Sequence, residues 1–353
     1  MSSSVDKSST PQSFFSGQNI LYAGIAWAVI ALLFFLLFSI NVPGEESPLW
    51  YLVGTYVLEL SPFLVAAILC YRNWRSPQIA SGRNVWLGIG LGTFCFFMGG
   101  LLFGWWELFL HLDPAVSPAD LFYLATYVFL GWGMVLAVLP RRLNLETWQW
   151  LIVGVVALLG IAFAVWLSIY TAEEPEVANL VASTSTDEQV VLTTASSQPS
   201  ESVQAIQVAQ EKSSALTSPT LTAQETVSEA EETADGKTPD WALSLEKTLD
   251  PLARWVNLFY IVGDVFLLII ASTLILAFWG GRFAQSWRMI AAASLCLYIA
   301  DMWFKYAEAT AVEYESGGLL EVFYIFSGVL FAIGAALEYD VSSRSRRSSR
   351  RRT

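Results

Sequence analysis

The sequence predicts an all-α membrane protein, built as a polytopic bundle of about eight transmembrane helices. Three observations indicate this fold class: 55% of the 353 residues are hydrophobic, the apolar residues form long runs, and most charges lie between those runs. A soluble protein has a lower apolar share, and a run of about 20 apolar residues spans a bilayer as a helix. The candidate spans are residues 19–41, 49–71, 84–109, 118–140, 147–170, 253–279, 286–308 and 318–338.

The loops between these spans alternate in charge, and this alternation predicts how the chain is oriented. Arginines follow spans two, four and six and fill the C-terminus, whereas the other loops are acidic. By the positive-inside rule both termini are cytoplasmic. We place the protein in a bacterial inner (plasma) membrane or a thylakoid membrane, surrounded by lipid. The arginines are Arg72, Arg75, Arg83, Arg141, Arg142, Arg282, Arg288, Arg344, Arg346, Arg347, Arg350, Arg351 and Arg352.

One segment accounts for the formal net charge of −12, because residues 171–250 contain 15 Asp and Glu against 3 Lys. The low isoelectric point therefore describes a single loop and does not indicate a nucleic-acid partner. Up to about residue 240 the loop is rich in Ser, Thr, Glu, Ala and Gln, so we expect it to be disordered and extracytoplasmic. Residues 238–252 suggest a short helix on the membrane surface, capped by Asp240, with Trp241, Leu243 and Leu245 facing lipid.

The chain also contains an internal match, at an offset of 201 residues, that predicts a duplication. Asp120 falls on Glu321, Tyr123 on Tyr324, and Glu107 on Glu308; a four-residue gap then brings Glu59 onto Asp264. Four spans return the chain to its starting side, so the expected architecture is a parallel 4+4 repeat. The predicted segments are an N-terminal tail (1–18), a first four-helix repeat (19–146), a fifth span (147–170), the acidic loop (171–250), three last spans (251–340) and a basic tail (341–353).

The most visible acids of this match have a structural interpretation. Ser117, Pro118 and Asp120 form a capping pattern, with Ser at the cap, Pro at the first helical position and an acid at the third. Gly318 and Glu321 repeat the pattern with a glycine cap. We therefore expect Ser117, Asp120 and Glu321 to start helices by satisfying free backbone N–H groups.

Charged residues deeper in the spans are the better candidates for function. Glu59, Asp264, Asp301 and Lys305 all lie inside apolar runs, where a charge costs at least ~2.5 kcal/mol unless it is paired, protonated or facing water. Asp301 and Lys305 are four residues apart and can pair along one helix face. Two interpretations stay open: a polar cluster that joins helices, or an acidic, outward-open cavity that binds a cation, a proton or a polar ligand.

Two further acids, Glu107 and Glu308, lie near the outer ends of their spans. They are either ordinary carboxylates at the membrane interface or additional ligand-binding candidates. Glu107, His111 and Asp113 suggest a metal site only weakly, because His111 is the single histidine. The three cysteines lie in or beside apolar spans without metal-ligand spacing. We therefore predict that the protein holds no metal and no cofactor. We also predict no enzymatic activity, because the sequence shows no nucleophile beside a base.

The stretch DPAVSPADLFYLATY, residues 113–127, follows a Trp-rich helix and resembles the multi-span membrane sensor module that precedes bacterial diguanylate cyclase domains. The segment from Tyr260 through Gly263 and Asp264 to Asp301 and Glu321 resembles the second half of that module. Here only about 15 residues follow the last span, in place of a catalytic domain. The resemblance implies sensing or scaffolding, with the output supplied by another protein. The Ser/Thr/Gln-rich insert and the many tryptophans resemble the style of cyanobacterial-type proteins.

These observations favour a non-enzymatic integral membrane protein that senses or scaffolds through a protein partner or as a homo-oligomer. The alternative is a transporter for a small solute, coupled to a cation or proton through its intramembrane carboxylates. Carriers often contain broken helices, and Ser61-Pro62 is the best candidate for such a break.

Overall fold

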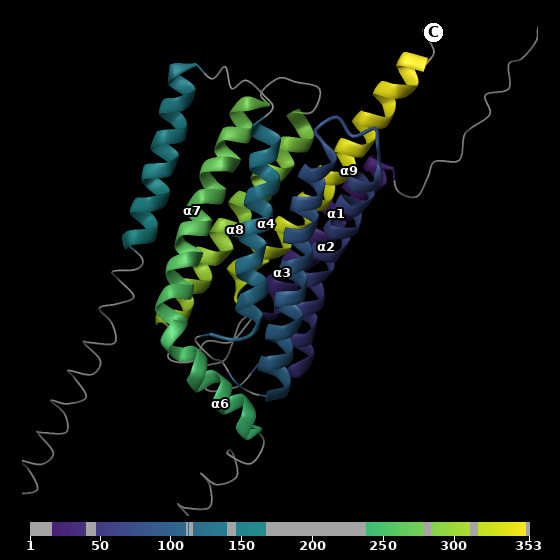
Figure 1. Ribbon diagram of the computed structural model, residues 1–353. Coiled ribbons are helices and arrows are strands. Elements are labelled where there is room, and N and C mark those ends of the chain that lie inside the picture. Colours follow the sequence, from purple (N-terminus) through teal and green to yellow (C-terminus); the bar gives the residue numbers. More distant parts are fainter. Residues whose placement is uncertain are drawn as a thin grey trace, which may run out of the picture. The chain divides into compact units, whose positions relative to one another are not determined.

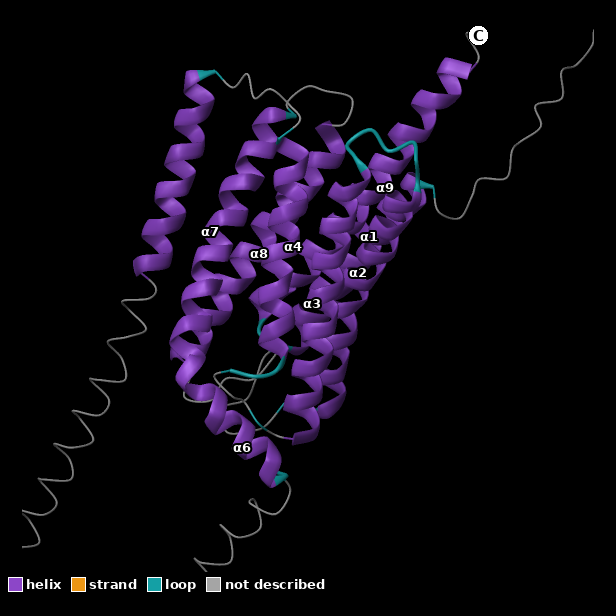
Figure 2. Cartoon of the chain, in the orientation of Figure 1, coloured by secondary structure: helices purple, strands orange, loops and turns teal. Residues whose placement is uncertain are grey.

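Every element of the described part of the chain is a helix, and this confirms the all-α fold class (Figure 2). The computed structural model describes residues 16–39, 47–110, 112, 116–139, 146–166, 238–278, 284–310 and 317–350, with the backbone alone at 308–310 and 345–350. Residues 1–15 of the expected N-terminal tail and residues 171–237 of the predicted acidic loop lie outside these residues.

Seven of the described helical segments are long and apolar enough to cross a membrane. The described elements are α1 (Gly17–Phe38), α2 (Leu49–Arg75), α3 (Arg83–Leu110), α4 (Ala119–Val138), the helix Thr147–Trp166, α6 (Asp240–Leu249), the 3₁₀ turn η1 (Asp250–Leu252), α7 (Ala253–Ala277), α8 (Ala284–Thr310), η2 (Leu319–Glu321) and α9 (Val322–Arg350). α8 is as long as the spanning helices, but Arg288, Asp301 and Lys305 make it more polar than they are.

Six helices form a closed ring in which each packs against two neighbours. The order around the ring is α2, α3, α4, α7, α8 and α9, and α9 closes it against α2. α2, α4, α7 and α9 begin at the end of the bundle where α6 lies, which is called the α6 end below (Figure 1). α3 and α8 run the opposite way and finish at the α6 end, so neighbours within each half are antiparallel.

Two helices pack on the outside of this ring. α1 lies along α9 and, more lightly, α2. The helix Thr147–Trp166 contacts α7 and α8 through Ala164 and through Gly160, whose carbonyl accepts a hydrogen bond of 3.2 Å from the Tyr298 hydroxyl. Much of the remaining surface of both outer helices is exposed and apolar, as expected of helices that face lipid.

Large apolar side chains fill the interior of the ring away from the α6 end. Trp86, Trp287, Ile290 and Phe331 have no exposed surface and belong to one continuous buried cluster. The Phe278 and Trp287 rings stack with their centres 4.8 Å apart. This half of the bundle is therefore a packed core, and the space for a site lies at the other half.

Three details differ from the sequence predictions. First, the short helix expected within residues 238–252 is present as α6, but its Leu245 packs near Trp106 and Leu110 of α3 where we expected it to face lipid. Secondly, α9 continues to Arg350, so most of the basic segment extends a helix. Thirdly, α2 runs unbroken through Pro62, and the Ser61 hydroxyl donates to the Val57 carbonyl one turn back.

Candidate functional site

A cavity of about 310 Å³ lies inside the six-helix ring, in the half nearer the α6 end. All six ring helices or the turns that start them contribute side chains to it. Among the described residues, eight aromatic side chains, four carboxylates and two basic side chains line the cavity. They are Tyr56, Phe96, Phe103, Tyr123, Tyr127, Tyr260, Phe304 and Tyr324; Glu59, Asp120, Asp301 and Glu321; and Arg254 and Lys305.

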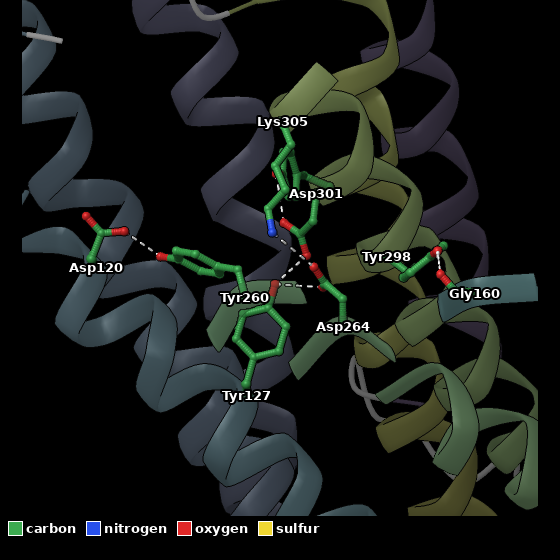
Figure 3. Close-up of polar contacts among 9 residues, drawn as sticks. Asp120, Tyr127, Gly160, Tyr260, Asp264, Tyr298, Asp301 and Lys305 are labelled. Atoms are coloured by element: carbon green, nitrogen blue, oxygen red, sulfur yellow. Dashed lines mark hydrogen bonds and ion pairs between the residues drawn. The ribbon is translucent and has the colours of Figure 1, made fainter. Parts of the chain in front are cut away.

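Hydrogen bonds from tyrosines connect the carboxylates of α7 and α8 across this cavity. The Tyr127 hydroxyl of α4 lies 2.8 Å from Asp264 Oδ1 and 2.6 Å from Asp301 Oδ2 (Figure 3). The Tyr324 hydroxyl of α9 donates to Asp301 Oδ1 at 2.9 Å. Four helices therefore meet at one polar network, in which Asp301 has both oxygens engaged by hydroxyl groups.

Lys305 provides the positive charge of this network. Its Nζ lies 3.8 Å from Asp264 Oδ2 and 5.2 Å from the centre of the Tyr260 ring. Both side chains of the ion pair are largely withdrawn from solvent, with 12% of Lys305 and 1% of Asp264 exposed. The sequence spacing allows Lys305 to pair with Asp301 along one helix face; the ion pair described here joins α8 to α7.

The helix-capping residues take part in the same cavity. Asp120 Oδ2 accepts hydrogen bonds from the Ser117 N–H at 2.7 Å, and the Ser117 Oγ accepts one from the Ala119 N–H. The other oxygen of Asp120 accepts the Tyr260 hydroxyl at 2.6 Å (Figure 3). Glu321 accepts the N–H groups of Gly317 and Gly318. A purely structural assignment of Asp120 and Glu321 is therefore too narrow, because both also line the cavity.

Glu59 differs from the other acids of the cavity. It is half-buried on α2, and within the described part of the chain its carboxylate has no hydrogen bond or ion pair. A carboxylate at this depth is costly unless it meets a counter-charge, a proton or water. Glu59 is therefore the acidic group that is available to an occupant of the cavity.

The remaining predicted residues lie elsewhere. Glu107 accepts a hydrogen bond from the Tyr56 hydroxyl and is outside the cavity lining. The side chain of Glu308, like all of His111, lies outside the described residues. No group of three His, Cys, Asp or Glu side chains among the described ones is placed to hold a metal ion.

Sequence reasoning missed the tyrosines that organise the network. A signal for them exists, because Asp120, Tyr123 and Tyr127 follow the spacing i, i+3, i+7, which places them on one helix face. Asn257, Tyr260 and Asp264 repeat this spacing on α7. Polar-tipped aromatic residues on the same face as an intramembrane acid would have predicted hydroxyl donors for it.

Comparison of the chain with protein-family models, curated proteins and solved structures finds no match. The site is therefore interpreted from its own chemistry. It combines carboxylates held by tyrosine hydroxyls, one buried ion pair, one accessible carboxylate and a wall of aromatic rings. This arrangement suits binding of a small polar or charged molecule.

Proposed function

We propose that the protein is a multi-pass membrane sensor that binds a small ligand in this cavity and acts through a partner protein. The observation that carries the proposal is the course of α9. At the α6 end, Tyr324 and the preceding Glu321 line the cavity. At its other end, α9 continues into the arginine-rich segment, which has the charge to meet a cytoplasmic partner or anionic lipid.

Contacts along α9 connect its two ends with the rest of the bundle. Near the arginines, Glu338 accepts the Ser81 hydroxyl at 2.7 Å, and Ser342 accepts the Ala80 N–H at 3.3 Å. Asp340 accepts the Gly17 N–H at the start of α1 at 2.8 Å. A ligand that shifts α9 at the cavity would therefore alter contacts with α1 and with the turn between α2 and α3, which gives binding a route to the far end.

The packed core between the cavity and the far end favours a sensor over a carrier. Trp86, Trp287 and Phe331 are fully buried there and leave the ligand site closed toward that side. Carriers commonly use discontinuous helices around a midplane site. By contrast, α2, α7 and α9 are continuous where they border the cavity.

Co-purification from the native membrane tests this function. The full-length tagged protein is extracted in mild detergent beside a variant in which Arg346, Arg347, Arg350 and Arg351 are changed to Gln. A stoichiometric partner that is retained by the wild type and lost from the variant supports the proposal. A homo-oligomer that recruits no partner in either form contradicts it.

A transporter is the second candidate, and the observation that favours it is Glu59, which has no partner in the described part of the chain. A carboxylate without a partner in a membrane cavity is a typical coupling-ion site. Uptake into proteoliposomes distinguishes this function: a solute or cation flux that Glu59→Gln and Asp264→Asn abolish would establish it. Unchanged flux in both variants would exclude those carboxylates from transport.

We also propose that α2–α4 and α7–α9 arose by duplication. The ring order supports it, because α2, α3 and α4 are followed by α7, α8 and α9 with the same neighbours in each half. The halves have since diverged: at the offset of 201, Tyr127, Asp301 and Lys305 fall on Gly328, Gly100 and Gly104. Among the described residues, Glu59, the counterpart of Asp264, consequently lacks the hydroxyl donor and the lysine that Asp264 has.

A further inference from the structure

We infer that the ligand of the cavity is an organic cation, either a protonated amine or a quaternary ammonium compound. The inference rests on the proposed function, because it names the ligand class of the same site. Three independent features of the cavity carry it: the balance of charge, the Glu59 carboxylate without a partner among the described residues, and the aromatic wall.

Negative charge exceeds positive charge inside the cavity. Glu59, Asp120, Asp301 and Glu321 line it, and Asp264 lies directly behind them in the network. Lys305 is the basic side chain at this depth, and its ammonium group already faces Asp264. Arg254 is exposed at the start of α7, so it lies nearer solvent than the buried carboxylates. An anionic ligand would meet repulsion here, whereas a cation would relieve it.

The hydrogen bonds single out Glu59 as the direct counter-ion. Asp120 and Glu321 accept backbone N–H groups, and Asp301 accepts two tyrosine hydroxyls. Those carboxylates are already stabilised by the protein. Glu59 has no such donor among the described residues, so a bound cation would supply the contact that the fold does not.

The aromatic wall and the size of the cavity indicate an organic cation. Tyrosine and phenylalanine rings attract cations through their negative faces, and Tyr56 of α2 and Tyr123 of α4 both line the cavity. A volume of about 310 Å³ is about ten times the ~30 Å³ that one water occupies. A bare metal ion would leave most of this space unfilled, while a small amine with several carbon atoms would contact the rings.

The test compares probes that match in shape and differ in charge. Choline is paired with its neutral carbon analogue dimethylbutanol, and putrescine with butanediol; acetate represents anions, and sodium chloride controls ionic strength. Binding to the full-length protein in detergent is measured by calorimetry and by the thermal unfolding midpoint. Glu59→Gln is the test variant, and Asp250→Asn, an exposed acid at the same end but outside the cavity lining, is the matched control.

We expect at least one cation to raise the unfolding midpoint while its neutral analogue does not. Glu59→Gln should weaken that binding by about 10- to 100-fold, the effect of losing one charge-assisted contact, and Asp250→Asn should change it less than about twofold. Equal binding of the neutral analogue, preferential binding of acetate, or no response to either cation would overturn the inference. The sensor function would still stand in those cases if the partner co-purifies, so the two failures are distinguishable.

Discussion

At the scale of single residues, the Tyr127 hydroxyl is the central contact of the site. It lies within hydrogen-bonding distance of two carboxylates that come from different helices. Such a hydroxyl lowers the cost of placing Asp264 and Asp301 side by side in a membrane interior. The network therefore depends on a residue that carries no charge itself.

Replacing this hydroxyl tests its role in stability. We expect Tyr127→Phe to destabilise the protein by about 1–2 kcal/mol, more than the ~0.6 kcal/mol of an average interhelical hydrogen bond in a membrane, because two acids lose their contact with this hydroxyl at once. Thermal unfolding in detergent measures the change. Tyr71→Phe is the control, since Tyr71 is 56% exposed on α2. Equal stability of both variants would show that the network contributes little.

The charged residues of this site could be predicted from the sequence, whereas the tyrosines whose hydroxyls bind them were not. Glu59, Asp301 and Lys305 are conspicuous because charges are rare in apolar spans, and the structure places all three at the cavity. Tyr127 and Tyr260 are less conspicuous because tyrosine is also common as packing at span ends. The partner of Lys305 was missed for another reason: local spacing favours Asp301, whereas the contact with Asp264 depends on the packing of two helices.

At the scale of helices, the closest approach between α3 and α4 depends on glycine. A Cβ atom on Gly88 would lie 2.7 Å from the Gly133 Cα, and one on Gly133 would lie 2.8 Å from the Ile89 N. Both obstacles are backbone atoms, which cannot rotate away. Small residues at such crossings let helices pack directly in a membrane.

Adding a methyl group at this crossing should separate the two helices. We expect Gly88→Ala to cost about 1–3 kcal/mol of stability through overpacking. Gly154→Ala on the helix Thr147–Trp166 is the matched control, because a Cβ there meets nothing within 4 Å. Thermal unfolding midpoints of the two variants provide the comparison. Loss of stability confined to Gly154→Ala, or absent from both, would contradict this account of the crossing.

The spans were the easiest elements to predict, because long apolar runs have few alternatives to a membrane helix. The short helix beside the spans and the point where the last span ends were harder to predict. α6 has only ten residues. Its Ala242 packs against Trp106 and Leu110, and a contact between residues so far apart in the sequence is not visible in a local pattern. The extension of α9 through Arg350 was missed because arginines were read for orientation, although Arg is also a good helix former.

At the scale of the whole molecule, the charge of the loops predicts an orientation in the membrane that can be tested directly. The arginine-rich loops and C-terminus should face the cytoplasm, because positive charges are retained there. A fluorescent reporter at the C-terminus should therefore fold and fluoresce, and protease added outside spheroplasts should cut within residues 171–237. Cleavage of the C-terminal tag from outside, with the acidic segment protected, would reverse the topology and place the cavity on the cytoplasmic side.

The ring also predicts that the protein can be divided between its halves. The contacts of α4 with α7 and of α2 with α9 join the two sets of helices, so residues 1–145 and 146–353, expressed together, should associate and co-purify. Gly263 lies at one of these contacts, where a Cβ would come 2.7 Å from the Tyr127 ring. Gly263→Leu in the second fragment should therefore weaken association, while Gly154→Leu should not. Fragments that purify separately without any substitution would show that the covalent connection is needed to close the ring around the cavity.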